Sequence, residues 1–319
     1  MNTAPILEVE NLKKYFKITK KDTLKAVDGV SFRVEEGTTL GLVGESGCGK
    51  TTVGRTIMRI YEPDGGKILY RGQDISELSP KDSAAFCRKI QMVFQDPYAS
   101  LNPFFTVGEI IGEGMDIQHL YTGKKERLEK IHELLELVGL RKEYINRFPY
   151  EFSGGQRQRV GIARALALEP EFIICDEAIS ALDVSIQAQV VNLLIRLRDE
   201  MNLSYLFIAH DLSMVRHISD TAAVMYLGCM VEYGDTDEVY SHASHPYTQG
   251  LLSSVPVADP NYERSHERIH MDGEIPSPIN PKPGCRFASR CRYASERCRC
   301  ETPILKEIAP KHYCACHMV

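Results

Sequence analysis

The feature that constrains this chain most is a nine-residue segment, Gly44–Thr52, which reads Gly-Glu-Ser-Gly-Cys-Gly-Lys-Thr-Thr. The apolar run Leu40–Val43 precedes it, and a helix is predicted over Thr51–Ile60. Three glycines let the backbone wrap closely and direct several N–H groups into one concavity that suits a polyphosphate. The start of the following helix adds the positive end of its dipole. The spacing is that of a phosphate-binding loop between a strand and a helix.

The residue types of this loop assign its chemistry. Lys50 is expected to reach the β- and γ-phosphates of a nucleotide, and Thr51 to offer its hydroxyl to a magnesium ion. Cys48 stands where a small residue is needed, and we favour that interpretation over a redox role. The predicted nucleotide-binding residues of the loop are Gly44, Glu45, Ser46, Gly47, Cys48, Gly49, Lys50, Thr51 and Thr52.

Composition excludes several functional classes. The 319 residues are 43% apolar and 25% charged with a net charge of −5, as in an ordinary soluble globular protein and unlike a typical nucleic-acid-binding chain. There is no apolar stretch of about 18 residues that could span a bilayer. Residues 1–5 are not followed by the apolar segment of a secretory signal. A cytosolic protein is therefore expected, with any membrane link through a partner.

Strand and helix patterns alternate along the chain, which predicts an α/β fold with a parallel sheet around the nucleotide site. Between about 97 and 158 only helical spacing is found, which indicates a helical insertion. A strand pair, 38–43 with 67–70, is predicted to flank the phosphate loop. The other predicted strands are 6–9, 26–34, 91–94, 172–175, 204–209, 221–227 and 230–233. After about residue 255 prolines become frequent, and 256–284 is interpreted as a linker into a cysteine-rich tail, 285–319.

Two carboxylates end a buried strand. The run Phe172–Cys175 is suited to a parallel strand and stops on Asp176 and Glu177. Asp176 is expected to help hold magnesium, and Glu177 to polarise the attacking water as a general base. Taken alone, such a run is more often a simple strand end. The distance from Lys50 and the flanking sequence make the functional interpretation more specific.

That flanking sequence is Phe152–Arg159, which contains Ser153, Gly154, Gly155 and Gln156 at the start of a predicted helix. Its glycines form a second backbone cradle for an anion. Since one chain binds one γ-phosphate at its own loop, a second cradle makes sense if it closes on a nucleotide held by another subunit. The structural alternative is a helix N-cap, which explains the serine alone.

These motifs together resemble an ATP-binding-cassette (ABC) transporter ATPase subunit over roughly residues 6–255. The matching segments, in order, are Gly44–Thr52, Gln95, Ser153–Gln156, Asp176–Glu177, Ser180–Asp183 and His210. The resemblance implies a P-loop NTPase fold with a RecA-like parallel sheet core, an N-terminal antiparallel β subdomain and the helical insertion. Phe152 and Ala178 depart from the commoner leucine and proline, but neither change removes a functional group.

The resemblance also implies roles for single residues. Phe16 (or Tyr15) looks like the aromatic residue that stacks on adenine. Gln95 looks like the glutamine that touches magnesium and water and senses the membrane partner. Asp183 looks like a contact between subunits, and His210 like the histidine that holds the γ-phosphate. The implied catalytic residues are Glu177, His210 and Gln95, and the implied magnesium site is Thr51, Gln95 and Asp176.

Three further segments, 94–103, 148–159 and 245–248, are similar to the ATPases of oligopeptide/dipeptide importers, with the OppF/DppF-like group nearest. This resemblance implies an ATPase that powers import of di- or oligopeptides from the cytoplasmic face of the membrane. The implied partners are a second ATPase subunit, two permeases and an extracytoplasmic binding protein. The alternatives are a soluble ABC ATPase of translation or DNA repair, an importer of nickel or glutathione, and a metal-sensing regulator.

Six of the ten cysteines lie in the last 35 residues. In a reducing compartment such a cluster indicates metal ligation sooner than disulfides. The resemblance implies a [4Fe–4S] cluster on Cys285, Cys291, Cys298 and Cys316. Zinc on the same thiolates is the alternative. Cys300 and Cys314 remain candidates for the fourth ligand.

Overall fold

The computed structural model describes residues 5–256, 268–271 and 273–319 and divides the chain into two compact units. The first, here called the helical unit, contains Glu35–Thr38 and Glu77–Ile208. The second, here called the phosphate-loop unit, contains Leu7–Val34, Thr39–Ser76 and Ala209–Val319. Each unit is described separately.

The helical unit is built on three parallel strands in the order β6 (Ile90–Val93), β7 (Phe172–Asp176) and β8 (Ser204–Ala209). Every residue of β7 and β8 is buried. Strands covered on both faces have uninterrupted apolar sequences, and this explains the runs seen there. The sheet delivers Asp176 at the carboxyl end of β7.

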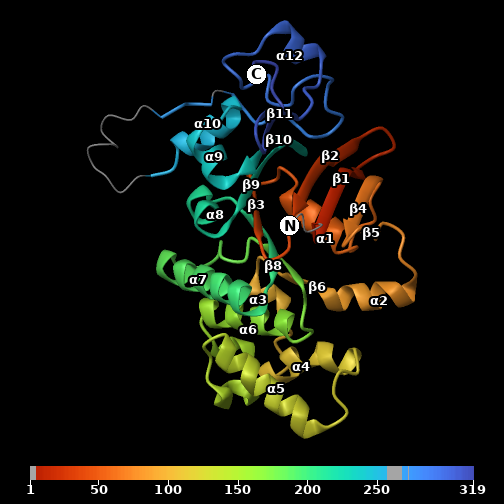
Figure 1. Cartoon of the computed structure of the whole chain (residues 1–319), viewed down its shortest axis with the longest axis vertical. Helices are drawn as coiled ribbons and strands as arrows, with labels where there is room; N and C mark the ends of the chain where they lie inside the picture. Colours follow the sequence, from red (N-terminus) through yellow and green to blue (C-terminus); the bar gives the residue numbers. More distant parts are fainter. Residues whose placement is uncertain (1–4, 257–267, 272) are drawn as a thin grey trace. The chain divides into compact units, whose positions relative to one another are not determined.

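Helices make up most of the rest of this unit (Figure 1). They are α2 (Pro80–Lys89), α3 (Pro97–Ser100), α4 (Val107–Ile117), α5 (Lys124–Leu137), α6 (Gly154–Leu166), α7 (Val184–Met201) and the 3-10 turns η1 (Lys142–Asn146) and η2 (Pro149–Glu151). A capping box between Thr106 and Glu109 starts α4, which packs against α5 and α6. At Gly108 an added Cβ would lie 2.5 Å from Cγ1 of Ile145, so a glycine permits this close packing.

The phosphate-loop unit contains a four-stranded antiparallel sheet in the order β2-β1-β4-β5. Its strands are β1 (Leu7–Lys17), β2 (Thr23–Val34), β4 (Gly65–Tyr70) and β5 (Gln73–Asp74). Leu7 pairs with both Val34 and Tyr70, so β1 is the central partner of the two long strands. This sheet corresponds to the antiparallel β subdomain that the sequence resemblance implies.

A second set of strands in the same unit carries the phosphate loop. β3 (Thr39–Val43) runs parallel to β9 (Thr221–Tyr226), and β10 (Cys229–Asp235), β12 (His312–Cys314) and β11 (Lys306–Ala309) follow by antiparallel pairing. The helices of this unit are α1 (Lys50–Ile57), α8 (Leu212–Ile218), α9 (Thr236–Ser241), α10 (Pro246–Ser253) and α12 (Glu296–Cys300). The C-terminal residues thus extend a sheet that begins beside the phosphate loop (Figure 1).

The structure corrects one pairing predicted from the sequence. The segments 38–43 and 67–70 do not form a pair, because β3 pairs with β9 while β4 pairs with β1 in the other sheet. The burial patterns give the reason. All five residues of β3 are buried, as in a strand covered on both faces, whereas β4 has exposed residues. The α/β character, the helical insertion and the remaining strands are found as predicted, and α2 is an element the sequence analysis did not identify.

Within the described ranges, no helix is long and apolar enough to cross a membrane. Part of the predicted linker, 257–267 and residue 272, lies outside the described residues. Its end is held in the phosphate-loop unit, because Asn280 Oδ1 accepts a hydrogen bond from the backbone N–H of Thr23 at 3.0 Å, and Ile279 bridges to Leu24. The predicted domain boundaries at 255 and 284 stay a prediction.

Candidate nucleotide site

The phosphate loop connects β3 to α1, as its sequence predicts, and two of its glycines are fixed by neighbouring backbone. At Gly49, where φ is +107°, an added Cβ would lie 2.1 Å from the carbonyl oxygen of Ala26 on β2. At Gly44 it would lie 2.2 Å from the carbonyl oxygen of Met225 on β9. Gly47, by contrast, faces open space with a φ of +78°. The loop is therefore held at both ends by strands, and its middle is exposed.

Lys50 is only 3% exposed and lies against its own loop. Its Nζ donates hydrogen bonds to the carbonyl oxygens of Gly44, at 2.8 Å, and Glu45, at 3.1 Å. A buried ammonium group needs such acceptors. These bonds place the positive charge inside the loop, where the sequence predicts a polyphosphate.

Cys48 is a small buried residue, as the sequence analysis favoured. Its side chain is 2% exposed, and burial raises the pKa of its thiol. The thiol is therefore protonated at neutral pH and is a poor nucleophile. Its carbonyl oxygen accepts a hydrogen bond from the backbone N–H of Gly228 at 2.8 Å, which fixes the loop against the β9–β10 turn.

In the helical unit, the structure brings two predicted catalytic residues together. Gln95 Nε2 donates a hydrogen bond to Glu177 Oε2 at 2.6 Å. Asp176, the preceding residue, is buried at 1% exposure. A glutamine that holds one carboxylate oxygen orients the other, so the carboxylate of Glu177 has a defined direction, as its predicted role as a base requires.

The backbone of Glu177 is held in the left-handed conformation, with φ of +45°. Its N–H donates to the carbonyl oxygen of Ile208 at 2.9 Å, and its own carbonyl accepts from both the N–H and the hydroxyl of Ser180. A non-glycine residue pays a steric penalty in this region of φ, and strained residues of this kind concentrate at functional sites. Three hydrogen bonds stabilise this strained backbone conformation of Glu177.

The Ser-Gly-Gly-Gln run begins α6 and forms a complete capping box. Ser153 Oγ accepts from the backbone N–H of Gln156, and Gln156 Oε1 accepts from the N–H of Ser153. The structural alternative, a helix N-cap, is thus confirmed. The cap does not prevent the same helix start from binding an anion. A hollow of about 290 Å³ is lined by Ser153, Gly155 and Gln156 together with Arg141 and Arg159. Two arginines at a helix N-terminus favour an anion.

Asp183 precedes α7 next to this hollow. Its side chain is exposed and makes no capping hydrogen bond, while its carbonyl oxygen accepts from the N–H groups of Ile186 and Gln187. An added Cβ at Gly155 would lie 2.4 Å from Cγ2 of Ile186, so α6 and α7 pack closely here. Asp183 is therefore presented outward from a rigid junction.

Both candidate adenine-stacking residues lie on β1 in the phosphate-loop unit. The Phe16 ring packs edge-on against Tyr61 with centroids 5.3 Å apart. The Tyr15 hydroxyl donates to Asp28, and burial together with that carboxylate raises the pKa of Tyr15. His210 is exposed between β8 and α8, after which Asp211 caps α8 through the N–H of Ser213. The roles of Phe16 and His210 stay predictions.

The cysteine-rich tail does not confirm the predicted iron–sulfur centre. Among the described residues, no group of three or more His, Cys, Asp and Glu side chains is arranged to hold a metal ion. The thiols of Cys285, Cys291, Cys298 and Cys316 are nevertheless neighbours. Burial and, to a smaller extent, the charges of the three other thiols together raise the pKa of Cys285 to about 11.

Sequence reasoning missed two residues that contact the phosphate loop. The backbone N–H of Glu45 donates to the Tyr247 hydroxyl at 2.9 Å, and Arg290 Nη1 donates to the Glu45 carboxylate. Both lie about 200 residues or more from the loop in sequence. In the C-terminal tail the cysteines form the most evident pattern, and no local sequence pattern links Tyr247 or Arg290 to the phosphate loop.

These features define an ATPase cassette of the ABC transporter class. They are the phosphate loop, the carboxylate of Glu177 bonded to Gln95, and the helix α6 that begins with Ser-Gly-Gly-Gln, here called the signature helix. Comparison with known proteins agrees: the ABC transporter family matches residues 27–180, and the oligopeptide/dipeptide transporter C-terminal region matches residues 231–298.

Individual relatives match over almost their whole length. The chain is 56% identical to the oligopeptide transport ATP-binding protein AppF of Bacillus subtilis, covering 99% of this chain and 98% of AppF. It is 54% identical to OppF of the same organism, covering 98% and 97%. A solved structure of the cassette MJ0796, a dimer in a post-hydrolysis state bound to ADP and Pi, is 27% identical with a TM-score of 0.65, covering 72% of this chain and 98% of that one. The chain belongs to the family of oligopeptide transport ATP-binding proteins.

Proposed function

We propose that this chain hydrolyses ATP to power the import of peptides across the cytoplasmic membrane. The observation that carries the proposal is the hydrogen bond from Gln95 to the carboxylate of Glu177, since it gives a general base a fixed direction beside Asp176. The names of the relatives, oligopeptide transport ATP-binding proteins, support peptides as the transported solute. They do not favour a soluble ATPase of translation or DNA repair, or an importer of nickel or glutathione.

ATP is bound through the residues of the phosphate loop. Lys50 exchanges its bonds with loop carbonyls for bonds to the phosphates, and the N–H groups around Gly47 donate hydrogen bonds to the phosphate oxygens. Thr51, Gln95 and Asp176 would hold magnesium, which neutralises phosphate charge when bound. Glu177 takes the proton of the attacking water, His210 holds the γ-phosphate, and Phe16 stacks on adenine. These roles are proposals.

The nucleotide site is completed by a second ATPase subunit. The hollow beside Ser153 and Gln156 carries two arginines and a helix N-terminus, which is the chemistry of a phosphate site. The related MJ0796 cassette was solved as a dimer. We assign Ser153–Gln156 to the ATP of the partner subunit, and Asp183 to the contact between the two subunits. A non-identical partner, two permeases and an extracytoplasmic binding protein complete the importer.

The chain is attached to the cytoplasmic face of the membrane through the permeases. We assign residues 1–255 to the ATPase domain, 256–284 to a linker and 285–319 to a C-terminal extension. The helical part, about 97–158, docks on the permeases near Gln95.

Peptide uptake into proteoliposomes tests this function. The complete importer is reconstituted with its binding protein and a labelled peptide, and only this subunit is changed. Lys50→Ala is expected to abolish ATP-driven uptake, because the phosphates lose their main positive partner. Uptake at the wild-type rate with Lys50→Ala, or a complex that contains ribosomes in place of permeases, would reject the proposal.

We also infer that the C-terminal extension binds a metal through Cys285, Cys291, Cys298 and Cys316. Backbone N–H groups two residues further on bond to three of these sulfurs, from Phe287, Tyr293 and Met318. Such bonds stabilise thiolates in metal centres. Two buried guanidinium N–H groups, Arg286 Nη1 and Arg290 Nε, have no hydrogen-bond partner among the described residues, so an anionic centre would suit them. A [4Fe–4S] cluster is favoured and zinc is the alternative.

Anaerobic purification followed by visible absorption and by iron, sulfide and zinc analysis tests this site. Cys298→Ser should lower the metal content, because Cys298 is buried among the other thiols. Cys300→Ser is the matched control, since Cys300 is exposed and is expected to leave the metal in place. A metal-free wild-type protein would contradict the inference.

A further inference from the structure

The C-terminal extension contacts the phosphate loop through one buried arginine. Arg290 lies between Cys285 and Cys291, and its side chain is 8% exposed. Its Nη1 donates hydrogen bonds to Glu45 Oε2 at 2.9 Å and to Oε1 at 3.2 Å. Glu45 is the second residue of the loop, and its side chain is 23% exposed. A charge-assisted bond in such a protected place is stronger than a surface ion pair.

Glu45 is held by three side chains at once. Its carboxylate accepts from Arg290, its backbone N–H donates to the Tyr247 hydroxyl at 2.9 Å, and its carbonyl oxygen accepts from Lys50 Nζ at 3.1 Å. Two of these groups come from elements C-terminal to β10, and the third is the lysine assigned to the phosphates. The position of that lysine therefore depends on contacts made by residues far along the chain.

An aromatic cluster makes the arginine rigid. Phe287 packs against Tyr226 and Tyr247 with ring centroids 5.2 and 5.4 Å apart, and Tyr226 packs against Tyr247 at 4.7 Å. Arg290 Nη1 also donates to the Tyr226 hydroxyl at 3.4 Å. Because the cluster is packed, the guanidinium group loses little further freedom when it binds Glu45.

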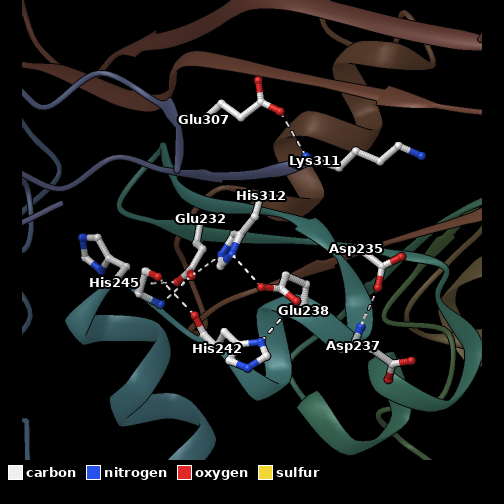
Figure 2. Close-up of polar contacts among 10 residues, drawn as sticks. Glu232, Asp235, Asp237, Glu238, His242, His245, Glu307, Lys311 and His312 are labelled. Carbon is white, nitrogen blue, oxygen red and sulfur yellow. Dashed lines mark hydrogen bonds and ion pairs between the residues drawn. The ribbon is translucent and has the colours of Figure 1, made fainter. Parts of the chain in front are cut away.

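A second anchor holds the extension to the same region (Figure 2). His312 on β12 and Glu232 on β10 are 1% and 0% exposed, and His312 Nε2 lies 2.8 Å from Glu232 Oε1. The Glu232 carboxylate also accepts from the backbone N–H groups of Ser244 and His245 at the start of α10. Since α10 carries Tyr247, this anchor fixes the hydroxyl that holds the Glu45 N–H. The extension therefore contacts Glu45 directly through Arg290 and supports it indirectly through Glu232, α10 and Tyr247.

We propose that Arg290 is a positioning residue for nucleotide binding: through Glu45 it keeps the phosphate loop and Lys50 in the geometry that accepts ATP. It does not touch the substrate. When it is removed, the Glu45 carboxylate loses its cation, and Glu45 loses one of the three side chains that hold it. The inference rests on the proposed role of Lys50 in phosphate binding.

Nucleotide affinity of the full-length chain tests the proposal. The dissociation constant of a fluorescent ATP analogue, the KM for ATP and kcat are measured for Arg290→Met, Arg290→Lys and Glu45→Gln. We expect Arg290→Met to weaken binding and raise KM about tenfold, the effect of one lost charge-assisted hydrogen bond, with kcat at saturating ATP nearly unchanged. Arg290→Lys should restore most of the affinity.

Two further variants make the result specific. Arg292→Met, at an exposed arginine two residues on, should bind as the wild type does. Glu45→Gln combined with Arg290→Met should lose no more affinity than Arg290→Met alone, because both changes break one contact. Wild-type affinity in Arg290→Met, or independent losses in the double variant, would overturn the proposal.

Lys50→Ala separates this failure from failure of the phosphate-loop assignment. If Lys50→Ala loses ATP binding while Arg290→Met keeps it, only the positioning role is wrong. If Lys50→Ala also binds ATP with wild-type affinity, both the proposed function of the loop and the proposed role of Arg290 are rejected.

Discussion

Glu177 combines a carboxylate with an unfavourable backbone conformation, and both are held by neighbours. Gln95 fixes the carboxylate, while Ile208 and Ser180 fix the backbone. A water-activating base needs such a fixed direction, because proton transfer depends on geometry before pKa.

Glu177→Gln tests the base directly. Glutamine is almost the same size and still has an oxygen to accept from Gln95, but it cannot take a proton. We expect ATP turnover to fall by about 10²- to 10⁴-fold with the affinity for ATP within about twofold of wild type. Turnover is measured as phosphate release and affinity by equilibrium binding. Turnover near the wild-type rate would assign the base elsewhere.

His245 gives a pH-dependent prediction. Its Nδ1 accepts from the backbone N–H of Tyr247, and burial lowers the pKa of His245 from 6.5 to about 4. Between these values the unfolded chain binds a proton at this residue that the folded chain does not. The contribution to stability is complete above pH 6.5 and falls by about 1.4 kcal/mol per pH unit as the pH drops toward 4.

The His245→Asn variant isolates this contribution, because asparagine can also cap α10 but does not titrate. The free energy of unfolding, from urea denaturation, should fall less steeply with acid in the variant than in the wild type between pH 6.5 and about 4. Equal slopes would show that the pKa of His245 is the same in the folded and the unfolded chain, so that burial does not lower it.

At the residue scale, the sequence located the residues of the candidate site and missed the residues that support them. Motif residues such as Lys50, Glu177 and Ser153 carry their chemistry in their type and spacing, so a single sequence identifies them. Arg290 and Tyr247 act through contacts with Glu45, which lies 245 and 202 residues away. Such a contact exists only after folding. Arg290 belongs to none of the motifs singled out in the sequence, and the segment 245–248, which contains Tyr247, indicated a family and no contact with the loop.

Among elements, the phosphate loop depends on how closely two strands approach it. Gly49→Ala places a Cβ against the backbone of Ala26, which cannot move without disturbing β2. Gly47→Ala also requires a positive φ, but its added Cβ would meet no atom within 4 Å. We expect Gly47→Ala to cost about 1 kcal/mol of unfolding free energy and Gly49→Ala about 3 kcal/mol or more, measured without nucleotide. Equal losses would mean that the loop is not held against β2.

The elements themselves were largely predictable, but their pairing was not. Helical spacing of apolar residues identified α7, which buries one face. Unbroken apolar runs identified β7 and β8, in which every residue is buried. The partner of β3 is β9, almost 180 residues later, so adjacency in sequence suggested the wrong pairing with β4. The short helix α2 has few apolar positions and gave no clear period.

At the scale of the whole molecule, the signature helix α6 is capped by residues of its own chain, and a hollow lies beside its first turn. Ser153 and Gln156 satisfy each other's backbone N–H groups, while the neighbouring hollow has arginines on its wall. This combination is expected of a surface that is rigid before its ligand arrives. It supports the proposal that ATP is enclosed when two ATPase subunits meet.

The central claim is that this cassette binds ATP through its own phosphate loop and that the ATP site is completed only when a second cassette binds. Light scattering of the Glu177→Gln chain mixed with its partner ATPase subunit measures this closure directly. We predict a stable two-subunit complex that forms with ATP, does not form with ADP, and is lost when Ser153→Phe fills the signature hollow. An ATP-dependent complex that survives Ser153→Phe, or full hydrolysis by the lone wild-type chain, would contradict the account.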